Sequence, residues 1–151
     1  MKIWVDADAT PQDVKRILFK GAVREEVHLT LVANVPLRHP DSPLLSCMVV
    51  DDGFNVADDW IVEQVEPSDL VITADIPLAA RVVEKGATAL NPRGTLYTEA
   101  NIHGILATRN LMDDLRGAQM IEGGGLPPYT KKDVQKFASA FNGFMVAGRK
   151  N

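Results

Sequence analysis

Short apolar runs alternate with stretches of helical periodicity along most of this sequence, and that alternation constrains the fold more than any other feature. Five runs have the length and composition of β-strands: Lys2–Val5, His28–Ala33, Leu44–Val50, Leu70–Thr73 and Ala87–Leu90. Strands that alternate with helices predict a parallel sheet covered by helices on both faces. We therefore expect an α/β fold, a doubly wound three-layer sandwich around a mainly parallel five-stranded sheet.

The segments between these runs predict the helices. Thr10 is expected to be an N-cap with Pro11 at the first helical position, and Pro77 opens a later helix. Further helices are expected over residues 57–66, 98–117 and 130–147, the last docked after a loop rich in glycine and proline. Because 151 residues is a usual size for one domain, we expect residues 1–151 to form a single domain.

Charge and cysteine content exclude several classes of protein. The formal net charge is −4, so nucleic-acid binding would need a local basic patch. Cys47 is the only cysteine, which rules out an intramolecular disulfide and a cysteine-based zinc cluster. Its run, LLSCMVV, predicts a buried strand with an inert thiol. No signal peptide precedes Asp6, and no stretch approaches the roughly 18 apolar residues of a membrane span, so we expect a cytoplasmic protein without membrane contacts.

Polar residues gather where the predicted strands end. In an open parallel sheet the ligand site lies outside the carboxyl ends of the strands. In chain order, the residues at those ends are Asp6, Asp8, Asn34, Asp51, Asp52, Asp58, Asp59, Asp75, Asn91 and Arg93. The amino ends carry no comparable set. One edge of the sheet is therefore expected to be strongly acidic, although the protein overall is only mildly so.

Some of these acids are expected to serve the backbone alone, because Asp is common in turns and N-caps. The stretch Asp51-Asp52-Gly53 fits turn chemistry better than site chemistry. For Asp6 and Asp75 a functional role is favoured, because both follow central strands. For Asp8 and Asp58 the structural and the functional interpretations are balanced.

Carboxylates that share a partly buried cleft repel one another and cost several kcal/mol each unless they are protonated or neutralised. A divalent cation removes that cost. Oxygen ligands with few histidines favour Mg²⁺ or Mn²⁺ over zinc. Such an ion can orient a phosphodiester, lower the pKa of an attacking water and stabilise the leaving oxygen.

Several long segments resemble the YaiI/YqxD family of uncharacterised bacterial proteins: WVDADA, LVAN, DLVITADIPLAARVVEKGA, ALNPRG and ATRNLMDDLR. The resemblance covers nearly the whole chain, and the family is similar in turn to PIN-like and NYN nuclease folds. In those folds an acid ends the first strand, another lies in the helix after the third strand, and a third ends the fourth. The resemblance places these acids at Asp6, Asp58 (or its neighbour Asp59) and Asp75. The family usually has Cys where this chain has Thr10, which counts against a catalytic thiol.

The leading hypothesis is a nuclease that depends on Mg²⁺ or Mn²⁺ and acts on RNA. Asp6, Asp58 and Asp75 would hold the ion, and Asp8 would hold a second ion or orient the attacking water. Candidate contacts to the substrate are Lys15, Arg24, Asn34, Asn91 and Arg93. Arg93 is the best placed of these, although its turn, Asn-Pro-Arg-Gly, also satisfies type I turn preferences.

Two other classes remain open. The stretch D-A-D-A-T at residues 6–10 fits the nucleophile loop of haloacid-dehalogenase-type phosphatases, with Asp6 as nucleophile and Asp8 as general acid. Ala79 and Ala80 stand where such enzymes have a further acid. The third class is a non-catalytic domain that binds RNA or a protein partner. The stripe of Phe137, Phe141 and Phe144 is explained best by core packing, less well by a homodimer interface and poorly by base stacking.

Overall fold

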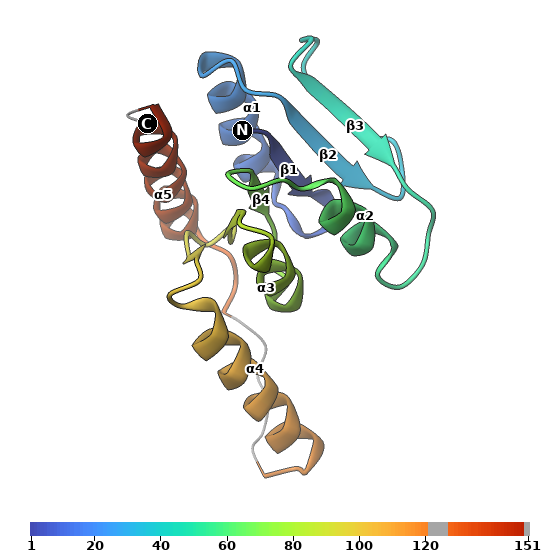
Figure 1. The fold of residues 1–151 in the computed structure, drawn as a ribbon, viewed down its shortest axis with the longest axis vertical. Helices are drawn as coiled ribbons and strands as arrows, with labels where there is room; N and C mark the ends of the chain where they lie inside the picture. The colour runs from blue at the N-terminus through green and yellow to red at the C-terminus, as the bar shows by residue number, and fades with distance from the viewer. Residues whose placement is uncertain (121–126, 150–151) are drawn as a thin grey trace.

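One six-stranded sheet forms the centre of the protein, as a computed structural model of residues 1–120 and 127–149 shows (Figure 1). The strand order is β3-β2-β1-β4-β5-β6. The strands are β1 Ile3–Asp6, β2 Leu29–Ala33, β3 Leu45–Val49, β4 Leu70–Ile72, β5 Thr88–Leu90 and β6 Leu96–Tyr97. All neighbouring pairs are parallel except β5 and β6. The expected α/β class and the mainly parallel sheet are therefore confirmed.

The expected count of five strands is wrong, because β6 was not anticipated. This strand has only two residues and follows a tight turn in which the Gly94 amide donates to the Asn91 carbonyl at 2.8 Å. Two residues are too few to show the alternating pattern of a strand. The sequence therefore predicts no strand here, only a helix from about Thr98. That helix, α4, begins at Ile102 rather than near Thr98.

Helices cover both faces of the sheet. They are α1 Gln12–Arg24, α2 Val56–Gln64, α3 Ile76–Glu84, α4 Ile102–Gly117 and α5 Lys131–Arg149, with a short 3₁₀ turn, η1, at Ala7–Ala9. The first core cluster contains residues of α1 and α5 on one face, and the second contains residues of α2, α3 and the start of α4 on the other. Beyond its buried first residue, Ile102, helix α4 extends away from the sheet (Figure 1). The sheet thus lies between two layers of helices, which is the expected three-layer arrangement.

The segment between β1 and α1 differs from the expected helix start. Helix α1 begins at Gln12, and Pro11 occupies the cap position without a side-chain hydrogen bond. Thr10 is not the N-cap: its hydroxyl donates to the backbone carbonyl of Asp6 at 2.8 Å and so closes the η1 turn. The prediction fails because residues 6–10 form a turn of their own, which satisfies Thr10 before the helix begins.

The aromatic stripe of α5 packs in the core, as expected. Phe137 and Phe141 are fully buried, and their rings stack with centroids 5.8 Å apart. Phe141 also lies against Gly21 of α1, where a Cβ atom would come within 2.4 Å of the Phe141 ring. Phe144 is half-buried against the same cluster. Any side chain at residue 21 would therefore disturb the contact between α1 and α5.

The run around Cys47 is an edge strand rather than a buried one. In β3 only Leu45 is buried, while Met48 and Val49 are exposed and Cys47 is half-buried. A uniformly apolar run cannot distinguish a central strand from an edge strand, which explains the wrong prediction. The glycines of the predicted loop before α5, residues 123–125, lie outside the described residues. No helix in the described part of the chain is long and apolar enough to cross a membrane.

Candidate functional site

The strand order brings the predicted acids together at the carboxyl edge of the sheet. Asp6 is the last residue of β1, and Asp75 follows the adjacent strand β4. Asp58 lies in the first turn of α2, and Asp8 lies in η1. The charges of Asp58, Asp75 and Asp8 all act on Asp6, which shows that the four carboxylates share one neighbourhood. We call Asp6, Asp8, Asp58 and Asp75 the acidic cluster.

Asp6 is the buried member of the acidic cluster, with 8% of its surface exposed. The Thr73 hydroxyl donates to Asp6 Oδ2 at 2.9 Å, and the same hydroxyl oxygen accepts the Asp75 amide at 3.0 Å. Across residues 1–120 and 127–149, no fully buried side-chain oxygen or nitrogen lacks a hydrogen-bond partner. The second oxygen of Asp6 has no such partner there, so it is not fully buried.

Sequence reasoning did not single out Thr73 as part of the site. Its signal is its place between strand β4 and Asp75, where a buried hydroxyl can link the ends of two neighbouring strands. Because it contacts both Asp6 and the backbone of Asp75, Thr73 fixes the two carboxylate-bearing segments relative to each other.

A second buried aspartate, at the opposite edge of the sheet, has a purely structural role and can be compared with Asp6. Asp69 is 4% exposed, and its carboxylate accepts three hydrogen bonds. The donors are the backbone amides of Lys2 and Glu66, both at 2.9 Å, and the indole N–H of Trp4 at 3.0 Å. Asp69 is thus satisfied by neutral donors, whereas Asp6 has one neutral donor and three negatively charged neighbours.

Burial and the crowding of charge both affect the protonation of the cluster. Burial raises the pKa of Asp6 from 3.8 to about 6; the hydrogen bond from Thr73 opposes that rise, and the charges of Asp58, Asp75 and Asp8 add to it. Burial, then the charge of Asp75, also raises the pKa of Asp58, against the opposing effect of Arg81. The cluster therefore holds negative charge that its protein neighbours do not neutralise.

This imbalance predicts how the stability of the metal-free protein depends on pH. The folded pKa of Asp6, about 6, lies above its ordinary value of 3.8, so the folded state binds the proton more tightly than the unfolded state. The contribution of Asp6 to stability is therefore present below pH 3.8 and is lost as the pH rises through 6. The full loss corresponds to about 3 kcal/mol.

Asp6→Asn should remove this loss. In urea unfolding with EDTA present, we expect the variant to gain stability relative to wild type as the pH rises from 4 to 7, by up to about 3 kcal/mol. Using the difference between the two proteins cancels the titration of groups that do not interact with Asp6. A difference that stays constant over this pH range would contradict the raised pKa of Asp6.

The neighbours Asp58 and Asp59, between which the sequence does not decide, differ in their surroundings. Asp59 is exposed and forms an ion pair with Arg81 at 2.8 Å. Asp58 is half-buried, and the charge of Asp75 acts on it. Asp58, which belongs to the acidic cluster, has no ion pair within the described residues, whereas Asp59 lies outside the cluster and has one.

Asp75 also has a structural role. Its Oδ1 accepts the Leu78 amide at 2.9 Å and so caps helix α3. Among the described residues, no three His, Cys, Asp or Glu side chains already form a group that could hold a metal ion. A divalent cation bound between Asp6 and Asp75 would therefore have to draw Asp58 or Asp8 inward by a change of side-chain rotamer.

The candidate substrate contacts do not gather around the acidic cluster in the same way. Arg24 lies at the end of α1 near the amino edge of the sheet, where its guanidinium donates to Asn142 of α5 at 3.3 Å. Lys15 is buried in the first half of α1. Asn34 follows β2 and donates to Asp52 at 2.8 Å, which supports turn chemistry for that aspartate.

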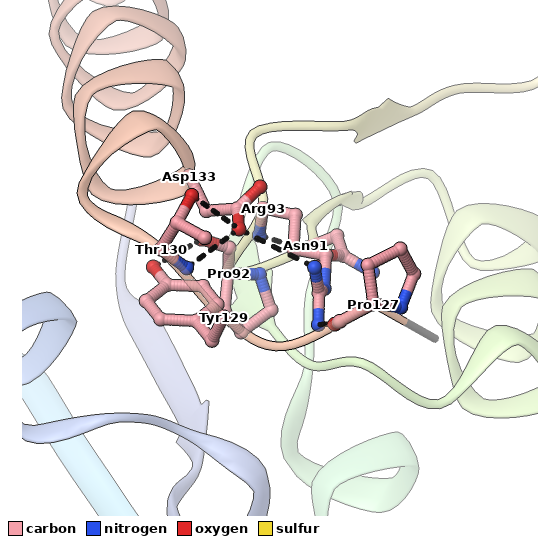
Figure 2. A network of polar contacts seen from close by, with 7 residues as sticks. All are labelled: Asn91, Pro92, Arg93, Pro127, Tyr129, Thr130 and Asp133. Atoms are coloured by element: carbon pink, nitrogen blue, oxygen red, sulfur yellow. Dashed lines mark hydrogen bonds and ion pairs between the residues drawn. The ribbon is translucent and has the colours of Figure 1, made fainter. Parts of the chain in front are cut away.

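Asn91 and Arg93 hold the turn after β5 and anchor the start of α5 (Figure 2). Asn91 Oδ1 accepts the Arg93 amide at 2.7 Å, and its Nδ2 donates to the hydroxyl of Tyr97 at 3.0 Å. The Arg93 guanidinium pairs with Asp133 at 3.3 Å, donates to the Pro127 carbonyl and lies over the ring of Tyr129. Both of its terminal nitrogens thus already have a partner within the protein.

The amino-acid sequence of this chain is similar to those of a set of bacterial proteins. The family model described as "Uncharacterized BCR, YaiI/YqxD family" matches residues 4–147. A UPF0178 protein of Maridesulfovibrio salexigens is 56% identical over 146 residues, which cover 97% of this chain and 96% of that protein. UPF0178 proteins of Geobacter sulfurreducens and Shewanella baltica are each 52% identical over 145 residues, 96% of either chain. No solved structure matches this chain.

Proposed function

We propose a function from the site itself, because the chain belongs to the YaiI/YqxD family, whose description states no activity. The proposed function is hydrolysis of phosphodiester bonds, with RNA as the favoured substrate and Mg²⁺ or Mn²⁺ as the cofactor. The observation that carries the proposal is the acidic cluster. Four carboxylates from four segments of the chain lie at one sheet edge, and burial, together with the charges of the other three, raises the pKa of Asp6.

Each residue of the site has a role in this proposal. Asp6, Asp58 and Asp75 bind the cation, and Asp8, which is exposed at the rim, orients a water or holds a second ion. Thr73 holds Asp6 in place through its 2.9 Å hydrogen bond. The bound cation would supply charge that stabilises the leaving oxygen and lowers the pKa of an attacking water.

The physical case for a cation rests on what else could neutralise these acids. The charge of Arg81 acts on Asp58, but Arg81 is paired with Asp59. Hard divalent ions prefer carboxylate oxygens, and the acidic cluster contains no nitrogen or sulfur ligand. Neutralisation by Mg²⁺ or Mn²⁺ would remove the repulsion that the folded protein otherwise carries.

Binding of Mn²⁺ is the direct test. We expect Mn²⁺ to raise the melting temperature of wild type, because an ion that binds only the folded state stabilises it by about 2.7 kcal/mol at a hundredfold excess over Kd. Crystals soaked in Mn²⁺ should give anomalous signal between Asp6 and Asp75. If the ion neither stabilises the protein nor appears at this edge of the sheet, the metal-dependent proposal is wrong.

Two neighbouring variants make a matched control for this test. Asp58→Asn should weaken the Mn²⁺ effect by about tenfold or more in affinity, whereas Asp59→Asn should change it less, because Asp59 is already paired with Arg81. Both variants remove the same charge from adjacent positions in α2. Equal losses would show that the cation responds to net charge and is not bound at the acidic cluster.

The phosphatase alternative stays a prediction with a separate readout. It would use Asp6 as the nucleophile, and its further acid would have to stand near Ala79 or Ala80 in α3, which offer none. Beryllofluoride mimics an aspartyl-phosphate, so its binding at Asp6 would favour the phosphatase over the nuclease.

A further inference from the structure

A shallow, open groove of about 810 Å³ lies between helix α5 and the turn that joins β5 to β6. The turn contributes Arg93, Gly94 and Thr95, and α5 contributes Lys132, Gln135, Lys136, Ser139 and Ala140. We call these eight residues the basic groove. Three of them are cationic and none is acidic, although the whole chain has a net charge of −4. The basic groove is therefore a local reversal of the overall charge.

The lysines of the basic groove lie on the outward face of α5. Lys132 and Lys136 are one helical turn apart, about 6 Å along the axis, while Phe137 and Phe141 point into the core. Both lysines are exposed, and within residues 1–120 and 127–149 neither ammonium group makes a hydrogen bond or an ion pair. The charge of Lys136 also acts on Asp133, the ion-pair partner of Arg93, while both ammonium groups stay exposed to an anionic ligand.

The two walls of the groove are held together independently of any ligand. A Cβ atom at Gly94 would lie 2.7 Å from the Lys136 carbonyl carbon, so the turn rests directly on the helix backbone. Gly94 has a φ of 95°, which favours glycine at this position. Arg93 and Asp133 tie the same two segments, and the Tyr129 hydroxyl donates to the Pro92 carbonyl at 2.7 Å (Figure 2). A preformed groove binds without the cost of ordering its walls.

The position of the turn relates the basic groove to the acidic cluster. The turn follows β5, and β5 pairs with β4, which precedes Asp75. Neighbouring strands are roughly 5 Å apart, so the carboxyl end of β5 lies one strand away from the end that carries Asp75. The turn that carries Arg93 thus lies beside the acidic part of the same sheet edge.

We propose that the basic groove binds the sugar–phosphate backbone of a single-stranded nucleic acid through Lys132 and Lys136. A basic groove that tracks the backbone is the usual way in which proteins bind single strands without sequence preference. The groove would hold one part of the strand while a neighbouring phosphodiester of the same strand reaches the acidic cluster. This placement of the phosphodiester rests on the proposed function. Binding itself does not depend on it.

The test measures binding without turnover. The probe is a fluorescein-labelled single-stranded RNA of about 16 nucleotides, the upper end of known site sizes, followed by fluorescence anisotropy in EDTA at several salt concentrations. We expect the double variant Lys132→Gln/Lys136→Gln to bind on the order of tenfold more weakly at low salt. The slope of log affinity against log salt should fall by about 1.4, because two phosphate contacts are lost.

Two controls separate the groove from net charge and from folding. Lys2→Gln/Lys20→Gln removes the same charge from exposed lysines outside the groove and should bind as wild type does. Lys132→Arg/Lys136→Arg keeps the charge and should also bind as wild type does. If the groove variant binds as tightly as the Lys2/Lys20 control, or if wild type does not bind the RNA, the proposal is overturned. Binding that depends on the groove in a protein that cleaves nothing would support this inference and refute the nuclease.

Discussion

Asp6→Asn should abolish cleavage of RNA in the presence of Mn²⁺ and leave the fold intact. Asp6 is the buried carboxylate of the acidic cluster and ends the central strand β1, so under the proposed function no neighbour could replace it as a metal ligand. Loss of a residue that merely orients a metal ligand typically costs 10- to 100-fold, so loss of the ligand itself should cost more than about a hundredfold. Asparagine keeps the shape and can still accept the hydrogen bond from Thr73.

The measurement is the rate of cleavage of a labelled single-stranded RNA, with wild type and variant purified in parallel. Asp51→Asn is the matched control, because Asp51 is an exposed acid near the same sheet edge and outside the acidic cluster. It should cleave at the wild-type rate. Wild-type activity in Asp6→Asn would refute metal-dependent cleavage at this site, whatever the metal-binding measurements showed.

Phe141→Ala should cause a large loss of stability. The Phe141 ring is fully buried, stacks on Phe137 and fills the space over Gly21. Truncation of a buried Phe to Ala typically costs about 3–5 kcal/mol, because both the transfer free energy and the contacts around the cavity are lost. Urea unfolding followed by circular dichroism measures this change.

The control for this loss is Leu111→Ala in α4, where the leucine is 55% exposed. Surface substitutions of this kind usually change stability by less than about 0.5 kcal/mol. If Phe141→Ala cost no more than Leu111→Ala, helix α5 would not dock on α1 as described. The comparison also asks whether α5 unfolds together with the sheet, because a separate transition would appear as two steps.

The fold could be predicted from local patterns because most strands here are short apolar runs between helices. The failures occurred where tertiary contacts decide the outcome. Strand β6 is defined by its pairing with β5, and the exposure of β3 is defined by its place at the edge of the sheet. Thr10 was misassigned because the backbone of Asp6 captures its hydroxyl.

The candidate site was predictable to the extent that sheet topology determines it. The rule that ligands bind at the carboxyl ends of strands placed Asp6, Asp8, Asp58 and Asp75 at one edge, and in the structure the charges of the other three act on Asp6. The contact from Thr73 and the pairing of Asp59 with Arg81 were not predictable, because each joins segments that are distant in sequence. The same holds for the basic groove, whose lysines meet Arg93 only once α5 has docked. Nuclease activity and the likeness to PIN-like folds remain predictions.

The late place of α5 in the chain has a consequence for how the protein is made. The ribosome completes every strand before it reaches Lys131, so the sheet surface that Phe137 and Phe141 later cover is bare while the nascent chain grows. Synthesis proceeds at roughly 5–20 residues per second, so this apolar surface stays exposed for seconds. During that interval the nascent chain offers a docking place to chaperones, and stalled or prematurely terminated products should be the forms that aggregate.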